Sequence, residues 1–303
     1  MKEKSLWDRG YAITTGRDPY EAYMALVVLE KAAEIQIKAR AFGGVKELSP
    51  AHARKERRKF LRKYSKPGLE RRNLSIKSDI KISPEGNSKI VDPNSEGDIN
   101  AEAIIFNLKG RIDLVHYGNE LVKNGLVQGT WGNISVRIDE EYMLTTPSGL
   151  DYDECSPEDM VKVNLKSFRG EESLNSPTSE KRLHGEIYKN RDDVGAVVHT
   201  HSKYCSLLAA CRMPLEVRDR DIAEKIGAIL MVADYGEAGS IKLSDNVIQA
   251  LGDRKGCIMS NHGMVAVGTD LDEAFENAIA MEEAARILVN HRMDQAIKDK
   301  EKE

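Results

Sequence analysis

The sequence predicts an α/β layered domain over residues 101–292, because short strand-like runs alternate there with helical patterns. Apolar residues recur at helical spacing from Ala101 to Asn124, and Gly125 ends that pattern. The runs that predict strands are 134–137, 142–145, 160–164, 196–200, 229–232, 256–259 and 265–267. The other stretches that predict helices are 180–190, 202–211, 244–252 and 271–291.

Residues 1–44 contain a further helical pattern, from Pro19 to Arg40. Asp18 can cap this helix, Pro19 suits its first turn, and Gly43 lies where the helix should stop.

Residues 16–40 also align without a gap with residues 268–292, sharing Gly, Asp, Glu-Ala, Ala-Ala, Ile and Arg positions. We therefore predict that residues 1–44 are a partial copy of the strand and helix that end the main domain. In this copy Arg9 stands where His262 stands in the main domain. The alternative is two amphipathic helices of similar composition.

Residues 45–100 form a basic and polar segment that we interpret as a linker. The basic run from Arg54 to Lys63 predicts a short helix, and the proline- and glycine-containing stretch after it predicts irregular chain. Such a run is typical of a solvated tether, and the alternative is an arm that binds nucleic acid or a membrane surface. Residues 293–303 form a charged tail.

Composition excludes several classes of protein. The chain has 303 residues with 45 basic and 49 acidic side chains, a net charge of −4 that disfavours nucleic-acid binding over the whole surface. The apolar run at residues 25–29 is too short to cross a bilayer, and the N-terminus lacks the apolar core of a signal peptide. The four cysteines form no CxxC pair, which suits a cytoplasmic protein without a thiolate metal site.

Three histidines are candidates for metal ligands. His199 and His201 are two residues apart on a predicted strand, so both side chains point to one face. His262 stands beside a glycine just after another predicted strand. Three neutral imidazoles leave room on zinc for a substrate oxygen. The alternative is ordinary histidines at a strand end, and we interpret His116 and His184 as packing or surface residues.

Two short segments combine glycine with small hydrogen-bond donors, namely 129–135 and 145–149. Backbone N–H groups in such loops can bind phosphate, although ordinary turns use the same residues. Thr178 and Ser179 predict the start of a helix, with Glu180 in its first turn.

Together these pieces resemble the class II aldolase/adducin family. G-T-W-G-N-I-S-V-R, L-T-T-P-S-G-L-D-Y, S-P-T-S-E, V-V-H-T-H-S and N-H-G-M-V-A-V-G occur in the order of that family, over residues 101–292. The resemblance is to the branch with fuculose-phosphate aldolase and ribulose-phosphate 4-epimerase. It implies an α/β/α sandwich around a mainly antiparallel sheet, and a homotetramer with active sites at subunit interfaces.

The resemblance also implies the residues of the site. It implies one Zn²⁺ per subunit, or another divalent metal, held by His199, His201, His262 and Glu180, with Glu180 also acting as the catalytic base. The implied phosphate-binding residues are Gly132, Asn133, Ser148, Gly149, Thr178 and Ser179. In the same comparison, residues 1–44 resemble the end of another such domain.

The implied activity is that of a lyase of carbohydrate metabolism, which cleaves a phosphorylated ketose into dihydroxyacetone phosphate and an aldehyde through a metal-stabilised ene-diolate. Alternatives are a sugar-phosphate 4-epimerase, dehydratase or decarboxylase, or a non-enzymatic adducin-like assembly module. The family's fuculose-phosphate enzymes take a proton donor from a tyrosine that would fall near residues 218–222, where this chain has none. The general acid is therefore unassigned; Tyr235 comes later in the chain.

Overall fold

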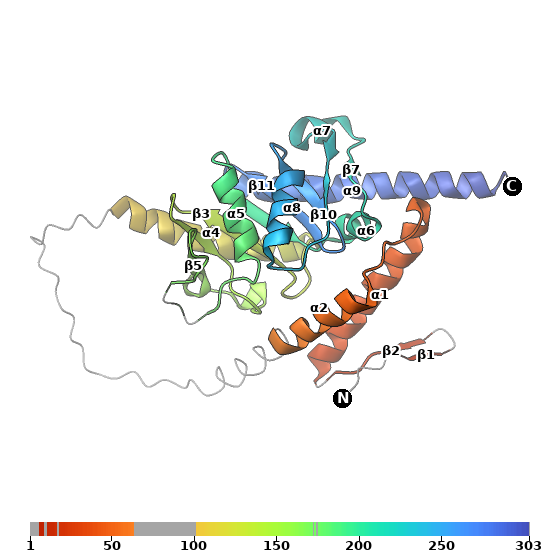
Figure 1. Ribbon diagram of the computed structural model, residues 1–303, viewed down its shortest axis with the longest axis horizontal. Helices are drawn as coiled ribbons and strands as arrows, with labels where there is room; N and C mark the ends of the chain where they lie inside the picture. The colour runs from red at the N-terminus through yellow and green to blue at the C-terminus, as the bar shows by residue number, and fades with distance from the viewer. Residues whose placement is uncertain are drawn as a thin grey trace, which may run out of the picture.

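The computed structural model describes residues 6–8, 11–16, 18–63, 101–171, 173 and 175–302. Its main sheet has the strand order β5-β4-β3-β6-β11-β10-β9 (Figure 1). Neighbouring strands are antiparallel except β9 and β10, which run parallel. The strands are β3 (Gly132–Arg137), β4 (Tyr142–Thr145), β5 (Val161–Asn164), β6 (Ala196–Thr200), β9 (Val232–Ala233), β10 (Gly256–Met259) and β11 (Gly263–Gly268).

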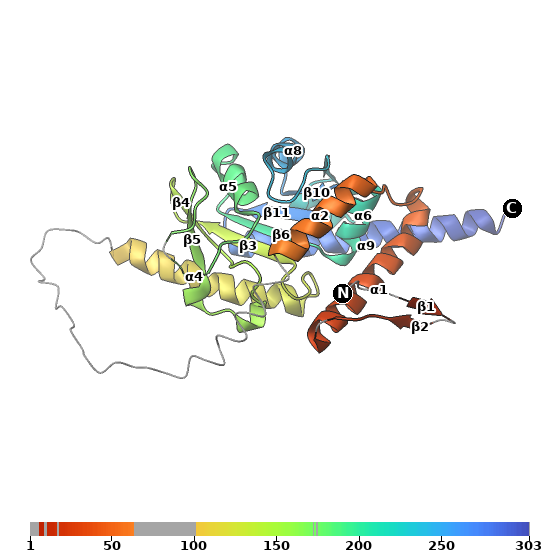
Figure 2. The same cartoon turned by 60° about the horizontal axis from the view of Figure 1, so that its bottom comes forward.

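Helices cover both faces of this sheet, which confirms the predicted α/β/α sandwich (Figures 1 and 2). Helices α4 (Ala101–Lys123), α6 (Lys203–Cys211) and α9 (Leu271–Lys300) lie on one face. Helices α5 (Lys181–Asn190) and α8 (Ile241–Leu251) lie on the other. Within the described residues, no helix is long and apolar enough to cross a membrane.

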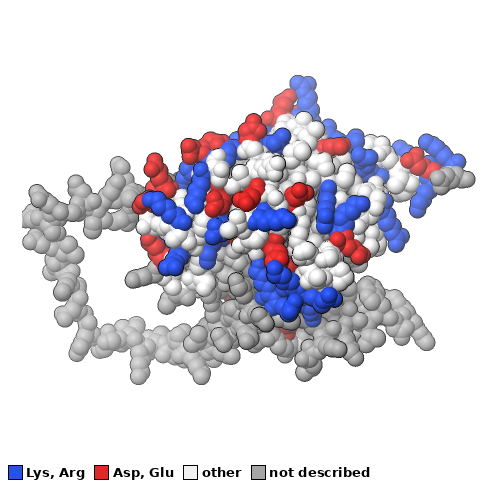
Figure 3. Space-filling view, viewed as in Figure 1, with Lys and Arg blue, Asp and Glu red and all other residues white. Residues whose placement is uncertain are grey.

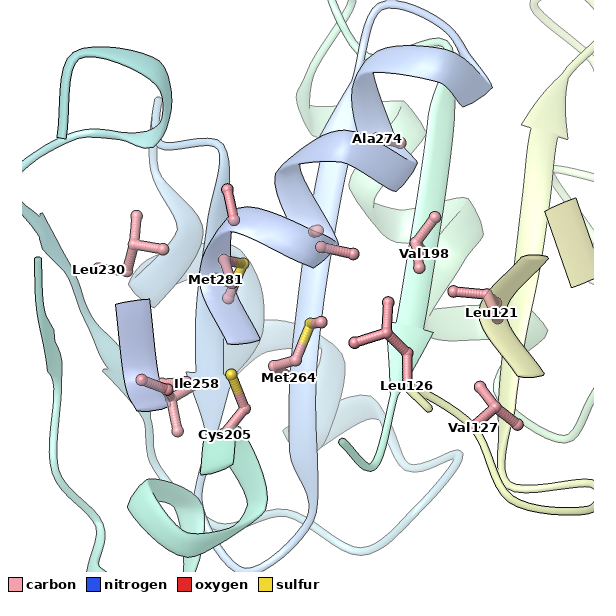
Figure 4. Packing of buried hydrophobic residues seen from close by; sticks show 14 of the residues in the cluster. Leu121, Leu126, Val127, Val198, Cys205, Leu230, Ile258, Met264, Ala274 and Met281 are labelled. Carbon is pink, nitrogen blue, oxygen red and sulfur yellow. The ribbon is translucent and has the colours of Figure 1, made fainter. Parts of the chain in front are cut away.

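The alternation of side chains along β6 divides the core in two. Val198 packs into the cluster beneath α9, in which Met264 and Met281 are also buried (Figure 4). Val197 packs into the cluster beneath α5 and α8. Burying each large aliphatic side chain contributes about 1.5–3 kcal/mol. Because successive strand residues face opposite ways, His199 points to the α5 and α8 face, as Val197 does.

Some elements differ from the sequence prediction. The predicted strand 229–232 is divided between β8 (Ile229–Leu230), which pairs with β7 (Leu215–Glu216) in a separate small sheet, and β9. Helix α7 (Arg220–Ile226) was not predicted, because a seven-residue helix shows too little periodicity. Helix α9 continues through most of the predicted charged tail. Within the described residues, short 3₁₀ helices lie at Ala39–Phe42, Tyr152–Glu154 and Pro157–Asp159.

The N-terminal region consists of β1 (Leu6–Asp8), β2 (Tyr11–Ile13), α1 (Pro19–Lys38) and α2 (Pro50–Lys63). Strands β1 and β2 pair as an antiparallel hairpin. Helix α1 starts at Pro19 as predicted, and the left-handed Gly43 (φ 80°) lies just beyond the 3₁₀ turn that follows it. Helix α2 occupies the basic part of the predicted linker, and residues 64–100 lie outside the described residues.

Helices α1 and α9 begin with the same local structure. Asp18 caps α1 and Asp270 caps α9, each accepting a hydrogen bond from the backbone N–H three residues on. A Cβ added at Gly16 or at Gly268 would lie 2.4 Å from a backbone nitrogen of the following helix. A repeated unit requires this agreement, but the duplication stays a prediction, and Arg9 lies outside the described residues.

Residues 18–63, which we call the N-terminal arm, lie against the main domain (Figure 2). Ala39 is fully buried in the core beneath α9. The backbone N–H of Lys46 donates to the carbonyl of Ala210 over 2.8 Å, and Nδ2 of Asn261 donates to the carbonyl of Lys46 over 2.7 Å. Lys203 and Glu34 form an ion pair at 2.8 Å between α6 and α1.

Glu282 of α9 holds the start of α6. Its carboxylate accepts hydrogen bonds from Oγ of Ser202 (2.6 Å) and from the backbone nitrogens of Tyr204 (2.7 Å) and Cys205 (3.0 Å). A carboxylate at a helix N-terminus is favoured by the helix dipole as well as by these bonds. The interaction fixes the chain that directly follows His201.

Replacing Glu282 by Ala should destabilise the fold by about 2–3 kcal/mol, because three donors lose a charged acceptor. Glu283→Ala is the matched control, since the carboxylate of Glu283 pairs with Arg286 at a half-exposed position on α9. We expect the control to change stability by less than about 0.5 kcal/mol. Urea unfolding measures both changes, and equal losses would contradict the role of Glu282.

Candidate metal centre

Four titratable side chains meet at one end of the central strands. His199 lies on β6, and His201 follows the last residue of that strand. His262 lies in the turn between β10 and β11, and Glu180 is the N-cap residue of α5. Because β11 pairs antiparallel with β6, the turn before β11 comes beside the end of β6.

The ligand atoms of these four side chains all lie within 4.8 Å of one another. Oε2 of Glu180 lies 3.0 Å from Nε2 of His199, and Oε1 lies 3.3 Å from Nε2 of His262. Nε2 of His199 lies 3.0 Å from Nε2 of His201. The three imidazoles pack edge to face with centroids 4.9 to 5.0 Å apart.

This donor set fits a divalent transition metal. Nδ1 of His199 donates to the carbonyl of Met264 over 2.8 Å, so Nε2 is the nitrogen that faces the other three side chains. Oε1 of Glu180 is buried and has no hydrogen-bond partner among the residues that the structure describes. A bound cation would satisfy that oxygen and separate the facing imidazole nitrogens.

Burial and mutual charge set the protonation of the cluster. Burial raises the pKa of Glu180, but His199 and His262 outweigh this effect and hold the pKa well below its ordinary value. Burial opposes protonation of His199, but the carboxylate of Glu180 raises its pKa on balance. Burial lowers the pKa of His201 strongly and that of His262 to about 4. His201 and His262 are therefore neutral near pH 7, as metal ligands must be.

A buried chain of hydrogen bonds leads from α5 to Glu180. Oη of Tyr188 lies 2.7 Å from Oγ of Ser135, which lies 2.6 Å from Nδ1 of His184. Nε2 of His184 lies 2.5 Å from Oδ1 of Asn133. Nδ2 of Asn133 then donates to Oε2 of Glu180 over 3.2 Å.

His184 can hold only one orientation of Asn133. Burial lowers the pKa of His184 to about 3, so the ring is neutral and carries one N–H. Because Asn133 uses its NH₂ group on Glu180, its oxygen must accept from Nε2–H of His184. His184 is fully buried, which corrects its interpretation as a possible surface residue. In the sequence, the one signal for this role of His184 was its spacing of four residues from Glu180, which places both on one helix face.

The three loops with predicted phosphate-binding residues meet beside the metal ligands. The backbone N–H of Ser148 donates to Ser176, and that of Thr178 donates to Thr146, which joins segments 145–149 and 176–180. Oγ1 of Thr146 accepts from the backbone of Ile134 over 3.3 Å, which ties both segments to β3. Gly132 and Asn133 begin β3, and the loops that carry Ser148, Gly149, Thr178 and Ser179 adjoin that strand.

The start of α5 differs from the prediction. Helix α5 begins at Lys181, so Glu180 is its N-cap residue rather than part of its first turn. Glu180 makes no capping hydrogen bond, because its carboxylate is turned towards the histidines. Oγ1 of Thr178 accepts instead from the backbone N–H of Glu180 over 3.3 Å.

Comparisons with known proteins agree on the family. The family model described as "Class II Aldolase and Adducin N-terminal domain" matches residues 112–289. A 5-deoxy-D-ribulose 1-phosphate aldolase of Bacillus thuringiensis serovar kurstaki is 36% identical over 182 residues, covering 59% of this chain and 84% of that protein. An L-fuculose phosphate aldolase of Methanococcus maripaludis is 37% identical over 161 residues, covering 53% and 86%.

Solved structures give the same result. An L-fuculose 1-phosphate aldolase matches with a TM-score of 0.56 and 33% identity over 59% of this chain and 84% of that one. The L-fuculose-1-phosphate aldolase from Thermus thermophilus matches with a TM-score of 0.56 and 26% identity over 63% and 96%. The matched relatives are named aldolases, which places the chain among enzymes of the lyase class. The chain belongs to the class II aldolase and adducin family.

Replacing His184 by Gln should make stability less sensitive to acid. The pKa of His184 is about 3 in the fold against an ordinary 6.5, so only the unfolded chain takes up this proton as pH falls below 6.5. Acid therefore favours unfolding of the wild type, by about 2 kcal/mol from this group at about pH 5. Gln keeps one donor and one acceptor without titrating.

Urea unfolding of both proteins at neutral pH and at about pH 5 tests this expectation. The loss on acidification should be smaller in His184→Gln by about 2 kcal/mol. The same loss in both proteins would show that His184 already takes up its proton in the fold.

Proposed function

We propose that this protein is a zinc-dependent aldolase that cleaves a phosphorylated ketose into dihydroxyacetone phosphate and an aldehyde. The observation that carries the proposal is the cluster of three imidazoles and one carboxylate, with ligand atoms within 4.8 Å of one another. Loops able to bind phosphate adjoin it through Asn133 and Glu180. Matched relatives named as aldolases act on phosphorylated sugars, which supports the substrate class.

His199, His201, His262 and Glu180 would hold the ion, and when bound it supplies electrostatic stabilisation of negative charge on the substrate oxygens. Neutral donors at the start of β3 (132–133) and in the loops at 148–149 and 178–179 would bind the phosphate and fix the position of the sugar chain. Glu180 would move the proton at the reacting carbon. The Asn133 amide would keep the Glu180 carboxylate oriented while this happens.

The order of strands gives the substrate a direction along the sheet edge. The phosphate loops belong to the β3 and β4 side, and the histidines lie at β6 and the β10–β11 turn. A ketose phosphate with its phosphate over β3 and β4 would extend past the metal ligands towards β10 and β9.

The proposal also includes the oligomeric state, a homotetramer with active sites at the subunit interfaces.

Metal content tests the ligand set. Purified wild-type protein should contain about one zinc ion per chain, and His201→Ala should lose most of it because one of the ligands is gone. His116→Ala is the matched control, since His116 is exposed on α4. Elemental analysis with zinc added back measures all three proteins. A wild type that takes up no zinc or other divalent ion would overturn the proposal.

Exchange of hydrogen into dihydroxyacetone phosphate tests the chemistry without knowledge of the aldehyde. In heavy water the wild type should exchange one proton of the hydroxymethyl carbon, as followed by NMR. Glu180→Gln should reduce the exchange rate roughly 100-fold or more, because the proton acceptor is removed. Zinc content reports whether the variant keeps its metal. Wild-type exchange that persists in Glu180→Gln would assign the proton transfer to another group.

A further inference from the structure

Helix α2 lies outside residues 112–289, the segment that the family model matches, yet it contacts the metal centre's side of the domain. Figure 3 shows Lys and Arg side chains gathered over α2 on this face of the molecule. The inner face of the helix carries His52, Lys55, Glu56 and Lys59, which follow the three- and four-residue spacing of one helix face. This face packs against the loop that follows β9.

Two lysines fasten α2 to that loop. Nζ of Lys55 lies 2.6 Å from Oε1 of Glu237, and Nζ of Lys59 donates to the carbonyl of Ala238. The ring of His52 packs edge-on against the ring of Tyr235, with centroids 5.8 Å apart. The contacts extend along the inner face of α2, so the helix is held at more than one turn.

The same loop and helix lie beside His262. The charge of Lys59 contributes to the lowering of the His262 pKa, after burial and the neighbouring His199. Nε of Arg212 donates to Oδ1 of Asn261, the residue directly before His262, over 2.9 Å. The positive charge of Arg212 also acts to lower the pKa of Tyr235. The influence of Lys59 indicates that the inner face of α2 lies near the turn between β10 and β11. Arg212, at the end of α6, interacts with both that turn and Tyr235.

Two buried polar atoms in this region have no hydrogen-bond partner among the described residues, Oε1 of Glu56 and Oη of Tyr235. Burial and the negative charges of Glu56 and Glu237 raise the pKa of Tyr235, so the phenol keeps its proton. The pair therefore offers one donor and one acceptor. A buried polar atom without a partner is costly unless a ligand supplies one.

We propose that Glu56 of α2 and Tyr235 together bind a hydroxyl group of the aldehyde half of the substrate. A ligand hydroxyl can accept a hydrogen bond from the phenol and donate one to the carboxylate. The inference rests on the proposed aldolase function, in which the end of the sugar remote from phosphate extends towards β10 and β9. A substrate that ends in a methyl group would leave both atoms unsatisfied.

The experiment is aldol addition of dihydroxyacetone phosphate to glycolaldehyde or to acetaldehyde, which differ by one hydroxyl group. The wild type should favour glycolaldehyde in kcat/KM. Glu56→Ala and Tyr235→Phe should each reduce that preference roughly tenfold, because one hydrogen bond to the hydroxyl is lost. Glu56→Gln keeps a neutral acceptor and should restore part of the preference. Glu47→Ala, an exposed carboxylate of the same arm, is the matched control.

Zinc content and thermal stability of each variant show whether its site is intact. Equal losses with both aldehydes, or an unchanged preference in Glu56→Ala, would overturn the hydroxyl-binding role of Glu56 and Tyr235, as would a wild type that favours acetaldehyde. Absence of hydrogen exchange into dihydroxyacetone phosphate in the wild type would instead overturn the aldolase function itself. The two failures are thus distinguishable.

Discussion

The pairing of β6 with β3 and β11 is the constraint on which the site depends. In this register His199 lies opposite Asn133 on one side and Val265 on the other. The same register places the carbonyl of Met264 where it fixes the His199 ring. A slip of one residue would turn His199 to the opposite face, beneath α9 and away from Glu180. Burial of Val197 and Val198 in separate core clusters therefore sets the geometry of the metal ligands.

Close backbone approach at the strand ends explains two glycines of the motifs. A Cβ at Gly263 would lie 2.3 Å from the carbonyl oxygen of Thr200, and one at Gly132 would lie 2.8 Å from that of His199. Gly132 also has a φ of 142°, a backbone conformation that residues other than glycine rarely adopt. Both residues let the neighbouring strands converge on β6. The motifs thus reflect packing around the histidines as much as contact with a ligand.

Much of this arrangement was predictable from local sequence. Strands 142–145 and 196–200 and the cap at Asp18 follow from patterns that neighbouring residues determine. Motif order gave the candidate ligands, but only the strand pairing shows that His262, far along the chain from His199, reaches them. His184 and Glu56 had no such motif, since each matters through contacts with residues distant in sequence. The division of 229–232 likewise depends on which sheet each half joins.

The buried chain of hydrogen bonds keeps the cluster of metal ligands in one arrangement, although burying such titratable groups is costly. Tyr188, Ser135, His184 and Asn133 are each satisfied only if every donor points towards Glu180. Reversing the Asn133 amide would set its oxygen against the Glu180 carboxylate and its NH₂ group against a donor on His184. Both contacts would be repulsive in a dry interior. Glu180 thus keeps its position through neutral groups, which leave its charge free to act on the histidines and on a bound ion.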